Sequence, residues 1–218
     1  MTDQDAIKLT NNTFDLIRQS RTILEVENIA DRLKIPDKNR MKVDEYPKIE
    51  FKITGEEIKT LLEQNFIDKN LNFSSTITSK LTDPLTKLLY AIAWKNGDLK
   101  KIKHIIKGVT DSENKDSEQD DALVFYQFGK YLTKISGQPI IDQHVIRAFA
   151  VYNETDNSQI KDLRKIETLN KKHKVIINEY KKWLTSDNLT TELRSEIDYS
   201  YHIDKLLFAT GKTIKSKS

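Results

Sequence analysis

Apolar residues from about residue 84 onward recur at helical spacing, and this periodicity constrains the fold more than any other feature of the sequence. Asp83 and Pro84 are typical of a helix start, as a capping residue followed by proline at the first helical position. Four apolar side chains follow at positions i, i+3, i+4 and i+7, namely Leu85, Leu88, Leu89 and Ile92. This stripe predicts a helix that buries one face and ends near Gly97.

Further helical segments are separated by glycine, proline and capping residues. The expected helices cover 98–108, 122–135 and 143–152, then two longer segments at about 157–184 and 190–210. Upstream, residues 13–34 have helical spacing with a break in the middle. The tail after residue 210 is expected to fray. Together these segments predict a mainly α, multi-helix fold of about eight helices.

One segment has strand periodicity instead. Ile49, Phe51 and Ile53 alternate with Glu50 and Lys52, and Pro47 precedes them. Alternation with a period of two residues is typical of a half-buried strand. The sequence therefore predicts one short strand near residues 48–53.

The length of 218 residues corresponds to roughly one and a half domains of typical size. We expect residues 1–78 to form an N-terminal extension packed on a helical domain of residues 79–218. The chain has no cysteine, which excludes disulfides, a thiolate nucleophile, Cys-ligated zinc and iron–sulfur clusters.

The formal net charge is only +3, but charge is unevenly distributed. Residues 95–107 hold five lysines and one aspartate, and residues 159–182 hold eight basic and three acidic residues. Between them, residues 111–121 hold six carboxylates and one lysine, and we expect this acidic segment to be mobile. The basic segments would suit a phosphate backbone, although lysine-rich helix faces are often merely solvated.

Several kinds of chemistry have no sequence support. The chain lacks GxxxxGK[ST], GxGxxG, GxSxG and HExxH motifs, and it contains six glycines in all. The four histidines are far apart in sequence, so we expect no metal site and no cofactor. The first residues lack a signal-peptide pattern, and no apolar run approaches the ~18 residues of a membrane span, so we expect a cytoplasmic protein without a membrane partner.

The segment Gly-Gln-Pro-Ile-Ile-Asp-Gln-His-Val-Ile-Arg at 137–147 carries the most specific signal. It resembles the signature of the helix-hairpin-helix DNA glycosylase superfamily, in which an Asp opens a helix in a pattern like D-x-H-V-x-R. The matching positions are Asp142, His144, Val145 and Arg147. The helix that starts at Asp83 also looks like the first core helix of that family, so the resemblance covers roughly residues 82–152.

The resemblance implies a DNA N-glycosylase that acts on double-stranded DNA with Asp142 as its catalytic carboxylate. Base removal builds positive charge on the sugar ring, and a nearby carboxylate stabilises that charge. Asp is also a favoured helix N-cap, and Arg147 could simply pair with a carboxylate, so a structural role for Asp142 stays open. A non-catalytic nucleic-acid-binding or protein-interaction domain is the alternative.

The chain departs from the family pattern at the hairpin. No glycine lies between Gly108 and Gly129, and the acidic segment stands where the hairpin should precede Asp142. No lysine matches the catalytic lysine of the lyase-type members, so the sequence favours monofunctional base excision.

Candidate DNA-binding residues come from the two basic segments. For phosphate binding these are Lys95, Lys100, Lys101, Lys103, Lys107, Lys181 and Lys182. Aromatic rings can stack on an extruded base. Trp183 follows two lysines, so it is the aromatic residue that we expect to be exposed for stacking.

Overall fold

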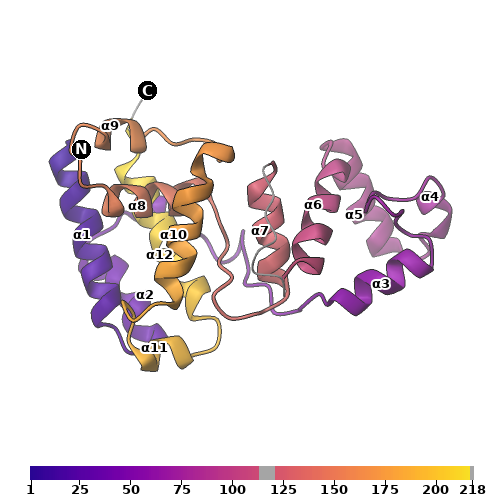
Figure 1. Cartoon of the computed structure of the whole chain (residues 1–218), viewed down its shortest axis with the longest axis horizontal. Coiled ribbons are helices and arrows are strands. Elements are labelled where there is room, and N and C mark those ends of the chain that lie inside the picture. Colours follow the sequence, from indigo (N-terminus) through magenta and orange to yellow (C-terminus); the bar gives the residue numbers. More distant parts are fainter. Residues whose placement is uncertain (113–120, 217–218) are drawn as a thin grey trace. The chain divides into compact units, whose positions relative to one another are not determined.

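The computed structural model describes residues 1–112 and 121–216 (Figure 1). Within these residues the chain is mainly helical, as predicted. It divides into two compact units: unit 1 comprises Met1–Ile49 and Ser136–Ser218, and unit 2 comprises Glu50–Ile135. The expected boundary between residues 78 and 79 falls inside unit 2, so this division differs from the one drawn from the sequence.

Unit 1 contains helices from both ends of the described chain. In chain order they are α1 (Asp3–Gln19), α2 (Ile23–Arg32), the 3-10 helix η1 (Asp37–Asn39), α8 (Gln143–Asn153), α9 (Ile160–Leu163), the 3-10 helix η2 (Lys171–His173), α10 (Lys174–Thr185), α11 (Thr191–Ser195) and α12 (Tyr199–Ile214). Unit 2 contains α3 (Gly55–Glu63), α4 (Ile77–Lys80), α5 (Pro84–Lys95), α6 (Leu99–Thr110) and α7 (Leu123–Leu132).

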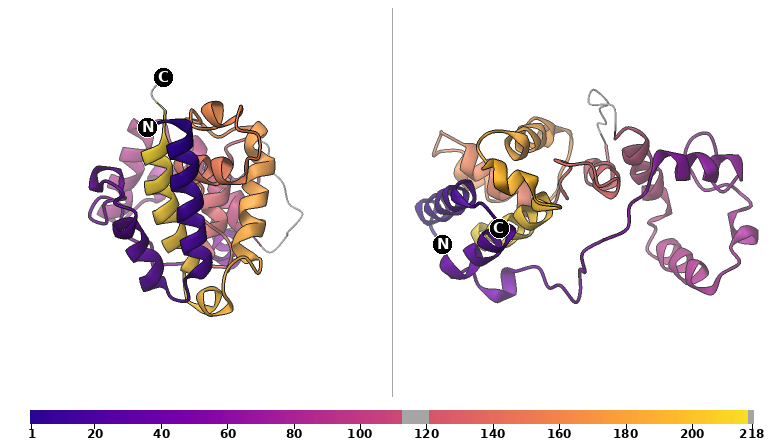
Figure 2. Two further views of the ribbon diagram at one scale, coloured as in Figure 1. Left: turned by 90° about the vertical axis from the view of Figure 1, so that its left-hand side faces the viewer. Right: turned by 90° about the horizontal axis from the view of Figure 1, so that it is seen from below.

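Helix α12 is the centre of unit 1, because it packs on α1, α2 and α8. Figure 2 (left) shows α1 in indigo and α12 in yellow side by side. Gly211 lets α12 approach α8 closely, since a Cβ atom at this position would lie 1.9 Å from the His144 carbonyl oxygen. Both α1 and α2 start with a complete capping box, at Thr2 and Thr22 respectively.

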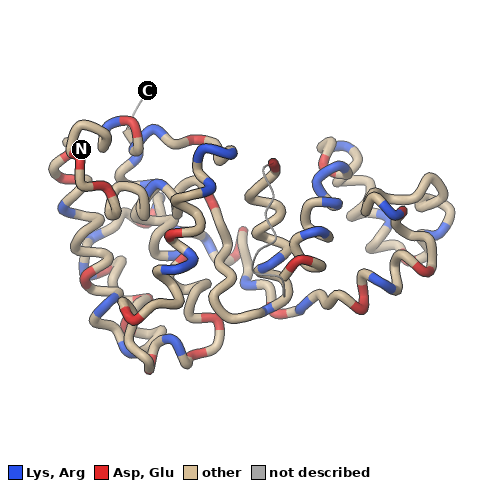
Figure 3. The backbone as a smooth tube through the Cα atoms, in the orientation of Figure 1, with Lys and Arg blue, Asp and Glu red and all other residues tan. Residues whose placement is uncertain are grey.

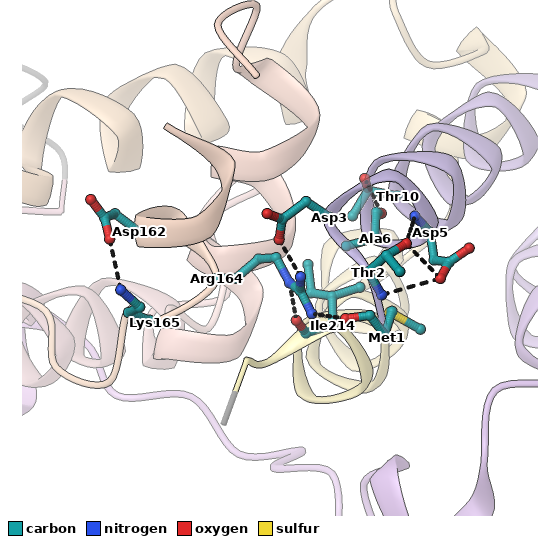
Figure 4. A network of polar contacts seen from close by, with 10 residues as sticks. All are labelled: Met1, Thr2, Asp3, Asp5, Ala6, Thr10, Asp162, Arg164, Lys165 and Ile214. Atoms are coloured by element: carbon teal, nitrogen blue, oxygen red, sulfur yellow. Dashed lines mark hydrogen bonds and ion pairs between the residues drawn. The ribbon is translucent and has the colours of Figure 1, made fainter. Parts of the chain in front are cut away.

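The buried Arg164 ties three parts of unit 1 together (Figure 4). Its guanidinium donates to the Asp3 carboxylate at the start of α1, to the Met1 carbonyl oxygen at 3.0 Å and to the Ile214 carbonyl oxygen at 2.7 Å. Because Arg has a rigid fork of N–H donors, one side chain can satisfy several acceptors at once. Arg164 therefore has a structural role.

In unit 2, α6 and α7 pack closely through two glycines. A Cβ atom on Gly108 would lie 2.0 Å from the Tyr126 carbonyl oxygen, and one on Gly129 would lie 2.0 Å from the Ile105 carbonyl oxygen. Gly108 lies inside α6 rather than at its end, contrary to the expectation that it closes the helix. A small apolar cluster built on Ile58, Ile67, Ile106 and Val109 joins α3 to α6.

Helix α5 forms where the sequence predicts it, but its stripe is not buried. Leu85, Leu88, Leu89 and Ile92 each expose more than half of their surface. Asp83 caps the helix by accepting from the Thr86 N–H at 3.0 Å. The prediction of an inward-facing stripe is therefore wrong, because within unit 2 the side of α5 that turns inward is the one carrying Tyr90 and Ala93.

The strand predicted near residues 48–53 is absent: the structure has no regular secondary structure there. Ile53 does turn inward onto the unit 2 cluster, whereas Phe51 is 62% exposed. The segment makes one backbone bond to α7, from Ile53 N–H to the Leu132 carbonyl oxygen at 2.9 Å. Alternation of apolar residues here thus belongs to a connection that has no partner strand among the residues that the structure describes.

Two further corrections concern the last third of the chain. The long helix expected over 157–184 is divided into α9, η2 and α10, and the one expected over 190–210 is divided into α11 and α12. Asp198 has a positive φ of 63° between the latter two helices, which breaks the helical path. Helix α12 continues to Ile214, so residues 211–214 are helical rather than frayed.

Candidate active site

The turn before α8 places Asp142 at the start of that helix. Gly137, at the beginning of this turn, has a φ of +76°, which is strained for residues with a side chain. Asp142 has extended backbone angles, and its Oδ1 accepts a hydrogen bond from the His144 N–H at 2.6 Å. This is the N-cap geometry that the sequence predicts for an Asp at this position.

Only one of the two carboxylate oxygens of Asp142 is engaged in this cap. Oδ2 makes no hydrogen bond or ion pair with any residue that the structure describes. The side chain is half-buried. One oxygen therefore holds the carboxylate in place, and the other is not used by the cap.

His144 and Arg147 extend the site along the first turn of α8. His144 Nδ1 lies 2.6 Å from Arg147 Nη1, and the edge of its ring meets Phe208 of α12. Burial lowers the pKa of His144, as do the charges of Arg147 and of two lysines at the end of α12, whereas Asp142 raises it. Because the net shift is downward, the imidazole is neutral at neutral pH.

Arg147 is fully buried and bonds to backbone rather than to a carboxylate. Its guanidinium donates to the Gly211 carbonyl oxygen at 2.9 Å and to the Ile166 carbonyl oxygen. Among the described residues it has no ion pair, and its Nε–H has no acceptor. Burial lowers the pKa of Arg147, while Asp142 and Glu167 raise it. The sequence alternative, in which Arg147 pairs with a carboxylate, is therefore wrong.

A buried carboxyl on α12 holds the turn that precedes Asp142. Asp204 Oδ2 accepts from the Ile140 N–H at 2.7 Å, and its Oδ1 accepts from the Tyr180 hydroxyl at 2.5 Å. Burial raises the pKa of Asp204 well above its ordinary value of 3.8, although both hydrogen bonds lower it. Asp204 is thus a positioning residue for the turn, and the sequence interpretation missed it.

This pKa shift predicts a pH-dependent stability. Because the pKa of Asp204 is higher in the folded than in the unfolded chain, its contribution is complete below pH 3.8 and is lost as pH rises through the folded pKa. We expect the unfolding free energy of the wild type, minus that of Asp204→Asn, to fall as pH rises from about 4. Urea denaturation at a series of pH values measures this difference, with the exposed Asp187→Asn as the control. A difference that is constant across pH contradicts the prediction.

The predicted phosphate-binding lysines lie in both units. Lys95 ends α5, and Lys100, Lys101, Lys103 and Lys107 lie on α6, all in unit 2; Lys181 and Lys182 lie on α10 in unit 1, as Asp142 does. Figure 3 shows the basic residues along α6 in blue. Lys101 is engaged by Asp98 at 2.5 Å and by the Phe125 ring.

The other three α6 lysines share one face of the helix, opposite its apolar side. Lys100, Lys103 and Lys107 stand at positions i, i+3 and i+7. None of them forms an ion pair within the described part of the chain. With respect to those residues, their ammonium groups are available to an anionic partner.

Trp183 is buried rather than exposed, so its predicted role in base stacking is contradicted. Only 7% of its surface is accessible, and its ring packs on Phe14, Phe149 and Tyr180. Lys182, directly before it, is exposed, and because α10 turns by about 100° per residue, the side chain of Trp183 is carried into the core.

Comparison with protein-family models, curated proteins and solved structures gives no match for this chain.

None of the described helices is long and apolar enough to cross a membrane. In the same residues no group of three or more His, Asp and Glu side chains could hold a metal ion.

Most of the acidic segment 111–121, which we expected to be mobile, lies outside the described residues. At the start of this segment, Asp111 accepts a hydrogen bond from the Tyr126 hydroxyl at 3.1 Å.

Proposed function

We propose that this chain is a DNA N-glycosylase-like protein that removes a base with the single carboxylate of Asp142. The observation that carries the proposal is that the two oxygens of this carboxylate have different surroundings. Oδ1 caps α8, and Oδ2 is left without a partner among the described residues. Because the cap uses only the first oxygen, the second oxygen can interact with a substrate while the helix stays capped.

The proposed reaction is hydrolysis of the bond between a base and its deoxyribose. As this bond breaks, positive charge develops on the sugar ring, and the negative charge of Asp142 stabilises it. Water then bonds to the anomeric carbon through its oxygen, and the departing base takes up one proton. No amine nucleophile is involved, in keeping with the absence of a family-type lysine near Asp142 in the sequence.

The surroundings of Asp142 support this role by fixing its position. The turn before it is held by Asp204, and the helix after it is held by Arg147 and by the close approach of Gly211. A catalytic group held on rigid elements needs little reorganisation during the reaction. Asp142 is therefore preorganised before any substrate binds.

Base release from defined duplexes tests the proposal. The full chain is incubated in excess with duplexes that each carry one damaged base: uracil, hypoxanthine, an alkylated purine or an oxidised purine. We expect one duplex to give strand cleavage only after alkali treatment, because a monofunctional enzyme leaves an intact strand with an abasic site. Absence of base release from every duplex contradicts the proposal, and cleavage without alkali contradicts the monofunctional mechanism.

A non-catalytic nucleic-acid-binding domain is the second candidate, favoured by the lysine face of α6. Binding to phosphates releases counterions, so affinity falls as salt rises. We expect Lys100→Ala, Lys103→Ala and Lys107→Ala together to reduce the slope of log K against log salt by about 0.9 for each phosphate that is no longer neutralised.

Fluorescence anisotropy of a labelled duplex at several salt concentrations measures this slope. Lys59, Lys69 and Lys87 are exposed lysines of the same unit, so their combined change to Ala is the matched control for charge. Equal slopes for the two triple variants would assign the α6 lysines to the solvated surface. DNA binding without base release would favour the second candidate over the first.

A further inference from the structure

A pocket of about 210 Å³ lies within unit 1, between α2, α12 and the segment that follows η1. Its apolar lining comes from Val26 and Ala30 of α2 and from Leu206 and Ala209 of α12. Two of these four residues are alanines, so the facing helices leave a space between them. A cavity of about 150 Å³ holds a benzene molecule, so this one accepts a branched or aromatic hydrocarbon group.

Charged side chains stand beside this apolar lining. Glu27 Oε1 lies 3.1 Å from His202 Nδ1 and 3.6 Å from Lys205 Nζ, and all three residues line the pocket. Burial lowers the pKa of His202, as do the charges of Lys48 and Lys205, whereas Glu27 raises it; because the net shift is downward, the ring is neutral at neutral pH. The neutral His202 ring therefore brings no positive charge to the pocket.

Both charged groups retain unused hydrogen-bonding capacity. Glu27 Oε2 has no hydrogen bond with any described residue, and 3.6 Å is too long for a hydrogen bond from Lys205 Nζ to Oε1. Arg40, which also lines the pocket, is already engaged by Asp31 at 2.6 Å and by the Ile35 carbonyl oxygen. Within the described residues, the pocket thus offers an acceptor and a donor of opposite charge to a ligand.

We propose that this pocket binds a free apolar α-amino acid, with its hydrocarbon side chain on the alanine-lined floor, its ammonium at Glu27 and its carboxylate at Lys205. An α-amino acid carries its two opposite charges on groups bonded to the same carbon, which matches the close spacing of Glu27 and Lys205. A simple anion would meet the charge of Glu27, and a simple cation would meet that of Lys205. The zwitterion is the charge-matched ligand, and its binding is independent of Asp142.

Isothermal titration calorimetry of the full chain tests the proposal with four probes. Leucine carries every proposed feature, N-acetylleucine lacks the ammonium, leucinamide lacks the carboxylate, and alanine lacks the long side chain. Because N-acetylleucine and leucinamide each lack one hydrogen bond between charged groups, we expect each to bind at least about tenfold more weakly than leucine. Alanine leaves the floor uncovered, so it too should bind more weakly.

Two variants connect the binding to the pocket. Glu27→Gln keeps the side-chain shape but removes its charge, so leucine should bind about tenfold more weakly, whereas N-acetylleucine should bind no more weakly than to the wild type. Ala30→Leu fills the floor and should abolish binding. Ala91→Leu, at an exposed alanine of α5, is its matched control and should leave leucine binding unchanged.

Three results would each overturn the proposal. They are no binding of leucine to the wild type, equal affinities for leucine and N-acetylleucine, and unchanged leucine affinity in Glu27→Gln. Thermal unfolding of each variant shows whether it is folded, and if Ala30→Leu does not fold, the probe series and Glu27→Gln still decide.

Discussion

Replacing Gly211 by Ala should destabilise unit 1 by about 3 kcal/mol or more, a large fraction of the 5–15 kcal/mol that typically stabilises a domain. The added Cβ would lie 1.9 Å from the His144 carbonyl oxygen and 2.7 Å from the carbonyl carbon. Both obstacles are backbone atoms, so no side-chain rotation relieves the clash. The helices α12 and α8 must move apart, and this exposes the centre of the unit to water.

Urea denaturation followed by circular dichroism measures the loss of stability. Gly55→Ala is the matched control, because nothing lies within 4 Å of a Cβ atom at that position and Gly55 stands in the first turn of α3. We expect this control to be neutral or slightly stabilising, since Ala is the better helix former. A change of less than about 1 kcal/mol for Gly211→Ala would show that the two helices do not approach each other this closely.

Asp142→Asn should reduce base excision by about 10²-fold or more, while the melting temperature stays nearly unchanged. Asn keeps the shape and can still accept the His144 N–H bond, so the helix cap survives. The substitution removes the negative charge that stabilises the developing cation on the sugar. Excision under single-turnover conditions, on a duplex that the wild type processes, measures the effect.

Two companion variants separate catalysis from capping. Asp142→Ala should lose about 1 kcal/mol of stability as well as the activity, because the cap itself is removed. Asp83→Asn changes the N-cap of α5 in the same way and should leave excision unchanged. Excision that survives Asp142→Asn would show that this carboxylate has only a structural role.

The starts of several helices were predictable, because capping residues mark them locally. Asp83, Asp98 and Asp142 each precede a helix at the predicted residue. The absence of a strand at 48–53 was not predictable, because apolar alternation says nothing about whether a partner strand is present. Trp183 is buried because of its position on α10. The prediction of an exposed Trp183 relied on the two lysines before it, which do not show which way the next side chain faces.

The candidate site was predictable only in part. The position of Asp142 follows from its own neighbours in sequence, whereas its support comes from Asp204 and Gly211 more than 60 residues later. One signal was present for Asp204, since a carboxylate amid the apolar residues Ile203, Leu206 and Leu207 of α12 needs buried partners. Nothing local points to the pairing of Glu27 with His202.

The interrupted course of unit 1 has a consequence for how the protein is made. Helices α1 and α2 leave the ribosome first, but their apolar faces pack on α8 and α12, which come after the whole of unit 2. At about 5–20 residues per second, synthesis of residues 50–135 takes roughly 4–17 s. During this time Phe14 and Ile17, fully buried in the finished fold, have no native partner from α8 or α12. Nascent chains that stop within unit 2 are therefore the ones most exposed to aggregation, and α12, which packs on α1, α2 and α8 alike, ends that period only when it is complete.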